Sequence, residues 1–212
     1  MLTSYFSESM LKRAISNNLI EVHTHNIRDW AEEPHYITDD RPFGGGAGMV
    51  LKPEPVFSAI DELKTAETKV VYLSPDGEAL NSPLAKDLSK NKHLIFLSGH
   101  YEGIDQRIRD EVVDLEVSIG DYILTNGTIA AAVLVDCISR FIPGVLGEQK
   151  SLEQDSFNDN TLGIPQYTRP ANFNGLPVPD VLLSGNHAHI ESWRKEQRLV
   201  KTQERRPELL AI

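Results

Sequence analysis

The strongest constraint on the fold is an alternation of short β-branched runs with helical stretches over residues 69–142. Such an alternation is typical of parallel strands joined by helical crossovers, so the sequence predicts an α/β fold with a parallel sheet. The predicted strands are Val70–Leu73, His93–Ser98 and Val112–Ile119. The predicted helices are one that starts at Ser82 with Pro83 in its first turn, Ile104–Asp110, and Ile129–Phe141, whose apolar residues form one stripe.

The flanking segments are less regular. Upstream, the patterns predict helices over Glu8–Asn17 and Pro53–Lys64 and a strand over Leu19–His25. Downstream, prolines recur from Pro143 onward, and the sequence shows no sustained helical or strand periodicity there. The next regular pattern predicts a charged amphipathic helix over His187–Arg205. We therefore expect an α/β domain (1–142), a linker (143–176) and a small helical domain (177–212).

Composition is that of a folded protein. Of 212 residues, 40% are hydrophobic and 25% are charged, which argues against disorder and low-complexity function. The single cysteine, Cys137, cannot form an internal disulfide, which fits a reducing compartment. The longest uncharged apolar run, Ile129–Val135, is too short to span a bilayer, and residues 1–17 lack a signal-peptide pattern. We expect a cytoplasmic protein with no membrane partner.

The charge balance limits how the chain can bind nucleic acid. A net charge of -10 repels phosphate backbones on average, which argues against non-specific coating of DNA or RNA. A specific site would need a local basic patch. The segment Trp193–Arg206 offers one, because its lysines and arginines outnumber its glutamates.

The turns after the predicted strands are the first candidates for a binding site, because ligands of open parallel sheets bind beyond the carboxyl ends of the strands. Each turn carries glycine or proline beside polar groups, which lets backbone atoms approach a ligand closely. Taken singly, each turn is also compatible with an ordinary strand-to-helix connection. The turns are Leu73–Gly77, Ser98–Gly103 and Ser118–Leu124.

Three further candidates have alternative readings. Gly44–Gly48 lacks the glycine spacing of nucleotide-binding loops, so we exclude that function. It is either a flexible surface loop or, because Asp39–Arg41 lie beside it, a loop that faces the substrate. Arg140 lies four residues after an aspartate, which favours a surface ion pair. Asp155 and Ser156 lie in the linker, where a turn or helix cap is their usual role.

Several long strings, in order and over nearly the whole chain, resemble the bacterial tRNA (guanine-37-N1)-methyltransferase family. The strings are DDRPFGGG (39–46), LSP (73–75), SGHYEGIDQR (98–107), SIGDY (118–122), RFIPGVLG (140–147), DSF (155–157), YTRP (167–170) and RRPELL (205–210). An accidental match of so many strings is far less probable than that of a lone glycine-rich loop.

The resemblance implies a SPOUT-class fold, in which the C-terminal part of the sheet domain forms a deep trefoil knot around S-adenosylmethionine. It also implies a homodimer whose two subunits share each active site. The cofactor-binding residues that it implies lie in or beside the three post-strand turns. They are Tyr72, Leu73, Ser74, Pro75, Gly99, Tyr101, Gly103, Ser118, Ile119, Gly120, Tyr122, Leu124 and Gly127.

The resemblance also assigns catalytic roles. Asp155 would remove the proton from guanine N1, whose lone pair is unavailable until that proton leaves. Arg140 would stabilise the negative charge that then spreads to O6, and Glu102 would assist near the cofactor. Use of Mg²⁺ is implied by the family, although the sequence shows no metal-ligand cluster and assigns no metal ligand. The basic C-terminal helix and the glycine loop would contact the tRNA anticodon loop.

The chain departs from the family's pattern in places. Asn126 and the residues up to Ala130 replace a usual Gly-Gly-Glu and Leu-Pro, Gln166 replaces a histidine, Ala47 replaces a proline, and Met1 aligns after the family's opening strand. Asparagine tolerates left-handed backbone, so the turn at Asn126 is expected to survive. Two alternatives stay open: a related methyltransferase with a different target base, and a catalytically silent protein that binds the cofactor or RNA.

Overall fold

A computed structural model of the chain describes residues 2–147, 155–157 and 159–211. The chain divides into two compact units, Met1–Gly147 and Glu148–Ile212. The first unit contains the sheet and its covering helices, and the second contains one long helix with short elements around it. The three domains predicted from sequence, with limits at residues 142 and 176, stay a prediction.

The centre of the first unit is a three-stranded parallel sheet in the order β4-β3-β5. Its strands are β3 (Thr68–Ala79), β4 (His93–Ser98) and β5 (Leu115–Ser118). The α/β class and the parallel sheet predicted from sequence are therefore confirmed. β5 is shorter than predicted because Val112 is the last residue of a helix and does not start the strand.

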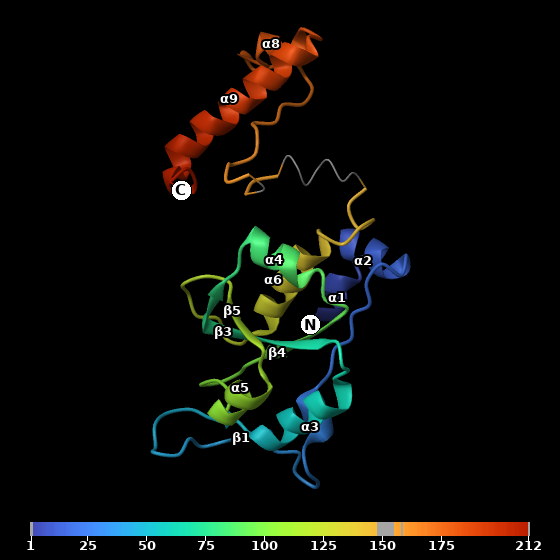
Figure 1. Cartoon of the computed structure of the whole chain (residues 1–212), viewed down its shortest axis with the longest axis vertical. Coiled ribbons are helices and arrows are strands. Elements are labelled where there is room, and N and C mark those ends of the chain that lie inside the picture. The colour runs from blue at the N-terminus through green and yellow to red at the C-terminus, as the bar shows by residue number, and fades with distance from the viewer. Residues whose placement is uncertain (1, 148–154, 158, 212) are drawn as a thin grey trace. The chain divides into compact units, whose positions relative to one another are not determined.

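Helices cover both faces of this sheet (Figure 1). The covering helices are α3 (Pro53–Leu63), α4 (Ser82–Leu88), α5 (Gln106–Val112) and α6 (Thr128–Ser139). Side chains alternate along β3, so that Val71 belongs to the core with α4 and α6, and Tyr72 to the core with α3 and α5. Leu88 and Ile108 are fully buried in the two cores, and burying such a side chain contributes about 1.5–3 kcal/mol. The sheet is thus fixed between two apolar layers.

β3 is interrupted where it passes the end of β4. Leu73 pairs with Val117 of β5, the chain then leaves the ladder, and Glu78 pairs with the same Val117. Residues 74–77 therefore form a bulge that begins at the predicted end of the strand. Gly77 makes this course possible, because a Cβ there would lie 2.4 Å from the backbone nitrogen of Val117.

The segment before the sheet contains short elements and one incorrect prediction. Its elements are α1 (Leu2–Phe6), α2 (Ser9–Ser16), η1 (Ile27–Trp30), β1 (Asp39–Asp40) and β2 (Val50–Leu51). The helix predicted over Glu8–Asn17 is confirmed as α2. The strand predicted over Leu19–His25 is wrong, because none of the described strands pairs with this segment. Its alternating residues favour extended backbone, but a strand also needs the edge of a partner strand.

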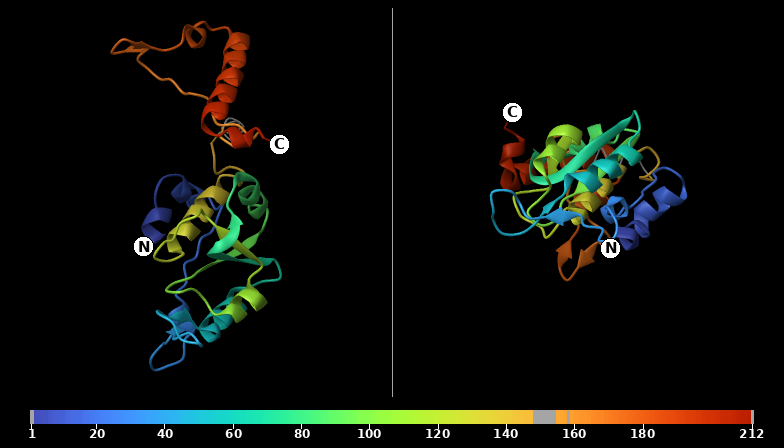
Figure 2. Two further views of the ribbon diagram at one scale, coloured as in Figure 1. Left: turned by 90° about the vertical axis from the view of Figure 1, so that its left-hand side faces the viewer. Right: turned by 90° about the horizontal axis from the view of Figure 1, so that it is seen from below.

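The second unit is built on α9 (His187–Arg205), which has the bounds predicted from sequence (Figure 2). Its other elements are β6 (Asn172–Phe173), β7 (Leu176–Pro177), α8 (Asp180–Leu183) and η2 (Pro207–Leu209). The chain around Leu162 runs along α9, where fully buried Thr202 accepts a hydrogen bond from the Leu162 N–H at 2.9 Å. Even α9 is too polar to cross a membrane, and no other helix in the described part of the chain could do so.

Candidate active site

The carboxyl ends of the three strands meet at one edge of the sheet. Leu73 of β3 lies opposite Ser98 of β4 and opposite Val117 of β5. The three turns selected from sequence therefore start at the same level. Ser74 and Ser118, the first polar residues beyond this level in their strands, are both buried. The structure thus brings the three turns together.

Tyr72 is buried next to the turn that follows β4. A Cβ at Gly99 would lie 2.9 Å from the Tyr72 hydroxyl oxygen, and a Cβ at Gly103 would lie 3.7 Å from it. The close approach of the phenol therefore requires glycine at Gly99. Burial raises the pKa of Tyr72, and the nearby Arg109 partly opposes this shift. The hydroxyl is protonated at neutral pH and is available as a hydrogen-bond donor.

The turn after β4 is a tight one. The Gly103 N–H donates a hydrogen bond to the His100 carbonyl oxygen at 3.0 Å. Gly103 has a φ of 118° and Tyr101 a φ of 57°, and a left-handed backbone is uncommon for a tyrosine. Tyr101 is left 51% exposed. The turn therefore holds an aromatic ring at the surface beside the strand ends.

The turn after β5 is closed by its own polar groups. The Gly120 N–H donates to the Ser118 Oγ at 3.2 Å, and the Tyr122 hydroxyl donates to the Ile119 carbonyl at 3.1 Å. A Cβ at Gly120 would lie 2.5 Å from the Tyr122 ring, so the ring folds over this glycine. Tyr122 and Leu124 remain exposed. This turn thus leaves two large side chains exposed after β5.

The chain beyond this turn comes back to the end of β4. The Gly127 N–H donates a hydrogen bond to the Gly99 carbonyl at 2.9 Å, and His100 and Asn126 form an antiparallel bridge. A Cβ at Gly127 would lie 3.1 Å from the Ser98 Cα. Only glycine fits between these backbones without displacing one of them.

The glycine-rich loop lies against Glu102. The Glu102 N–H donates to the Met49 carbonyl at 3.0 Å, and the Leu51 N–H donates to the Gly103 carbonyl at 3.0 Å. A Cβ at Gly48, whose φ is 83°, would lie 2.5 Å from the Glu102 Cγ. The loop is therefore anchored at one end to the turn that carries a predicted site residue, while Gly44–Gly48 themselves are exposed. A substrate-facing role of the loop stays a prediction.

Arg140 and Asp155, the two other predicted catalytic residues, belong to different units. Arg140 is the C-cap of α6 in the first unit. Asp155 lies in the second unit next to Ser156, whose Oγ accepts a hydrogen bond from the Gly163 N–H at 2.8 Å. The half-buried Ser156 thus has the turn-stabilising role considered from sequence. A meeting of Arg140 with Asp155 stays a prediction.

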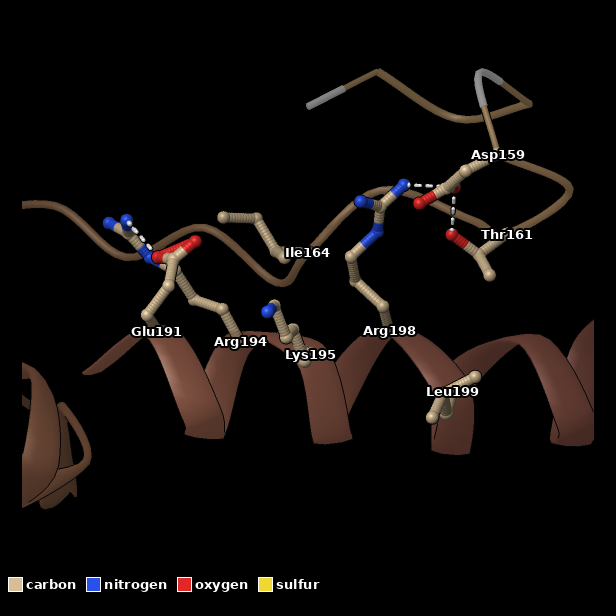
Figure 3. Close-up of a pocket in the computed structure, with 8 residues that line it drawn as sticks. All are labelled: Asp159, Thr161, Ile164, Glu191, Arg194, Lys195, Arg198 and Leu199. Atoms are coloured by element: carbon tan, nitrogen blue, oxygen red, sulfur yellow. Dashed lines mark hydrogen bonds and ion pairs between the residues drawn. The ribbon is translucent and has the colours of Figure 1, made fainter. Parts of the chain in front are cut away.

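The basic segment of α9 lines a pocket of about 320 Å³ in the second unit (Figure 3). Arg194 and Lys195 contribute to it from the helix. Arg198 is engaged within the unit, because it forms an ion pair with Asp159 at 2.7 Å and donates to the Leu162 carbonyl. Part of the basic charge counted in the sequence therefore holds the unit together.

Sequence reasoning missed Arg109 and Glu116, which form a network near the strand ends. Arg109 of α5 binds Glu116 of β5 through two hydrogen bonds and Asp76 of the β3 bulge through a third. Nothing in local spacing signals this network. Asn126 does not use the left-handed backbone that asparagine tolerates. Its Oδ1 instead accepts a hydrogen bond from the Thr128 N–H at 2.9 Å, a use that the order Asn-x-Thr at a helix start could have indicated.

Comparison with known proteins identifies the family. The family pattern described as tRNA (Guanine-1)-methyltransferase TrmD matches residues 1–212. This chain belongs to that family. A tRNA (guanine-N(1)-)-methyltransferase of Protochlamydia amoebophila is 57% identical over 97% of the chain and 93% of the relative. The enzymes of the same name from Staphylococcus carnosus and Staphylococcus aureus strain JH9 are 52% and 51% identical over 100% and 99% of the chain, and each match covers 86% of the relative.

Family membership confirms the resemblance seen in the sequence strings and, with it, the methyltransferase class. Use of S-adenosylmethionine follows from that class. No group of three or more histidine, cysteine or carboxylate side chains that could hold a metal ion is found among the described residues. We therefore assign no step of the reaction to Mg²⁺.

Proposed function

We propose that this chain transfers a methyl group from S-adenosylmethionine to N1 of guanosine 37 in tRNA. The observation that carries the proposal is the meeting of the three post-strand turns with Gly127 at one edge of the sheet. Those turns contain the strings that the family resemblance rests on. The relatives that match nearly the whole chain are named for methylation of tRNA guanine at N1.

The residues at the strand ends suit the cofactor. Tyr101 and Tyr122 are exposed, and their rings offer apolar faces. The glycines of these turns let a ligand approach the backbone closely. Ligand sites combine such apolar walls with a few polar groups. Bound there, S-adenosylmethionine supplies an electrophilic methyl group. The other residues that we propose to hold it are Leu73, Ser74, Pro75, Gly99, Gly103, Ser118, Ile119, Gly120, Leu124 and Gly127, with Tyr72 supporting the turn after β4.

The reaction requires a base, because guanine N1 carries a proton at neutral pH. We assign this role to Asp155, whose carboxylate would accept the N1 proton; general-base catalysis contributes about 10²–10⁴-fold. The guanidinium of Arg140 would stabilise the charge that develops on O6 as the proton leaves. Glu102, held against the glycine loop by Gly48, would orient groups next to the cofactor. Alignment of N1 with the methyl carbon supplies the remaining acceleration.

The finer features of the fold belong to the same proposal. The return of residues 124–127 to the end of β4 supports a trefoil knot. A homodimer with a shared active site would bring Arg140 of one subunit to Asp155 of the other. Exposed apolar side chains support such a contact surface, since Ile123, Ile129 and Val133 are each at least 41% exposed. A cytoplasmic location fits a tRNA substrate.

The tRNA would be bound through the second unit and the glycine loop. Arg194 and Lys195 on α9 offer positive charge for the phosphates. A guanine that is splayed out of the anticodon loop could enter the site, as single-stranded bases do in sequence-specific RNA recognition. The acidic remainder of the surface limits non-specific affinity.

The test is methyl transfer from radiolabelled S-adenosylmethionine to two tRNAs that differ only at position 37. We expect transfer when the base is guanine and none when it is replaced by adenine. Transfer to both would favour the related enzyme with another target. Cofactor binding without transfer to either would favour the silent protein, and each of these results would overturn the proposal.

A further inference from the structure

Arg109 joins three separate segments near the strand ends. It lies on α5, its Nε and one terminal nitrogen each donate to Glu116 of β5 at 2.7 Å, and a terminal nitrogen donates to Asp76 at 2.8 Å. Arg109 and Glu116 are both about three-quarters buried, whereas Asp76 is 64% exposed. The guanidinium therefore has a fixed position on β5 from which it holds the bulge of residues 74–77.

The same guanidinium contacts the support of the second turn. Its central carbon lies 5.8 Å from the centre of the Tyr72 ring, within the range of a cation–π interaction. The Tyr72 hydroxyl in turn packs against Gly99 of the turn after β4. Arg109 thus binds the bulge directly and also lies against Tyr72, which packs against the turn after β4.

We propose that Arg109 is a positioning residue for the cofactor site, which fixes the bulge that carries Ser74 and Pro75 relative to β5. This inference rests on the proposed function. Arg109 itself need not touch the cofactor. Its effect passes through Asp76, whose carboxylate is the bulge's anchor, and through Tyr72.

The ion pair between Arg109 and Asp76, called the Asp76 arm below, allows an effect on the position of the bulge to be distinguished from an effect on folding stability. An ion pair with one exposed partner contributes little to folding stability. Loss of this arm should therefore weaken cofactor binding and leave thermal stability nearly unchanged. Lys92 and Glu67 provide a matched control, because they form an exposed ion pair of 2.7 Å next to the amino ends of β4 and β3, away from the site.

The experiment compares Asp76→Asn, Arg109→Gln, the double variant and Glu67→Gln in the full-length protein. The affinity for S-adenosylmethionine is measured by calorimetry, kcat and KM by steady-state assays, and Tm by thermal melting. We expect Asp76→Asn and Arg109→Gln to raise the cofactor Kd and KM about fivefold or more, the fold-change of about 1 kcal/mol. The double variant should match Arg109→Gln, because both changes remove the same arm.

Under this inference, kcat at saturating cofactor and tRNA stays within about twofold for Asp76→Asn, and Glu67→Gln behaves as the unmodified protein does. Wild-type affinity in Asp76→Asn would overturn the inference, as would a fall in Tm with a parallel fall in kcat. If Arg109→Gln fails to fold, Asp76→Asn alone decides. An unmodified protein that binds no S-adenosylmethionine would instead overturn the proposed function.

Discussion

The backbone N–H of Gly127 donates a hydrogen bond to the carbonyl oxygen of Gly99 at 2.9 Å. The two are 28 positions apart in the sequence, and both were selected as parts of one binding site. The bond joins the start of α6 to the turn after β4. It lies at the edge where the strands end, so the spacing of these two backbones would set the shape of the proposed cofactor site.

Substitution of Gly127 should therefore impair cofactor binding. In Gly127→Ala the Cβ would lie 3.1 Å from the Ser98 Cα and 3.2 Å from the Gly99 nitrogen, and backbone atoms cannot yield as a flexible side chain does. We expect the Kd for S-adenosylmethionine to rise at least about tenfold, measured by calorimetry. Gly147→Ala is the control, because a Cβ there meets nothing within 4 Å. Equal affinities in the two variants would refute the role of Gly127.

The glycine loop allows a contact with Glu102 to be separated from backbone strain. Gly48 and Gly44 have φ values of 83° and 84°, so alanine causes similar strain at both, of about 1–2 kcal/mol. Only at Gly48 would the new Cβ also collide with the Glu102 side chain. We expect Gly48→Ala to reduce the rate of methyl transfer about tenfold more than Gly44→Ala does, at saturating tRNA. If the two variants were equally slow, the contact with Glu102 would have no catalytic consequence.

Thr202 should stabilise the second unit. Thr202→Val removes the fully buried hydroxyl that accepts a hydrogen bond from the N–H of half-buried Leu162, and such a loss costs about 1–3 kcal/mol. We expect the free energy of local unfolding to fall by that amount, measured by hydrogen exchange of the Leu162 amide. Thr168→Val is the matched control, because Thr168 is exposed. Unchanged protection of Leu162 would show that the bond adds nothing to stability.

Local signals were sufficient for the central strands and the longer helices, but not for the short elements around them. The short run His93–Ser98 predicted β4 with the bounds that the structure shows. The bounds of α9 were predicted from its charged amphipathic pattern. The structure adds the cap of this helix, because the Asn186 side chain accepts a hydrogen bond from the His189 N–H at 3.2 Å. The rule that ligands bind beyond parallel strand ends then selected the turns without any coordinates.

Features that depend on distant partners could not be predicted. The bulge after Leu73 involves Arg109, which lies more than thirty residues from the aspartate it binds. The segment Leu19–His25 has a strand-like pattern but no partner among the described strands. The catalytic roles predicted for Arg140 and Asp155 rest on the family resemblance alone. Their joint action is a prediction about the assembled enzyme.

Substitution of Asp155 tests the central claim most directly, because that claim is a proton transfer from guanine N1 to one carboxylate. Asp155→Asn has nearly the same shape but cannot serve as a base of the same strength. In single-turnover assays with saturating tRNA, we predict a loss of at least about a hundredfold in the rate of methyl transfer. The Kd for S-adenosylmethionine should stay within about twofold of that of the unmodified protein. A variant that methylates guanosine 37 at the unmodified rate would contradict the account.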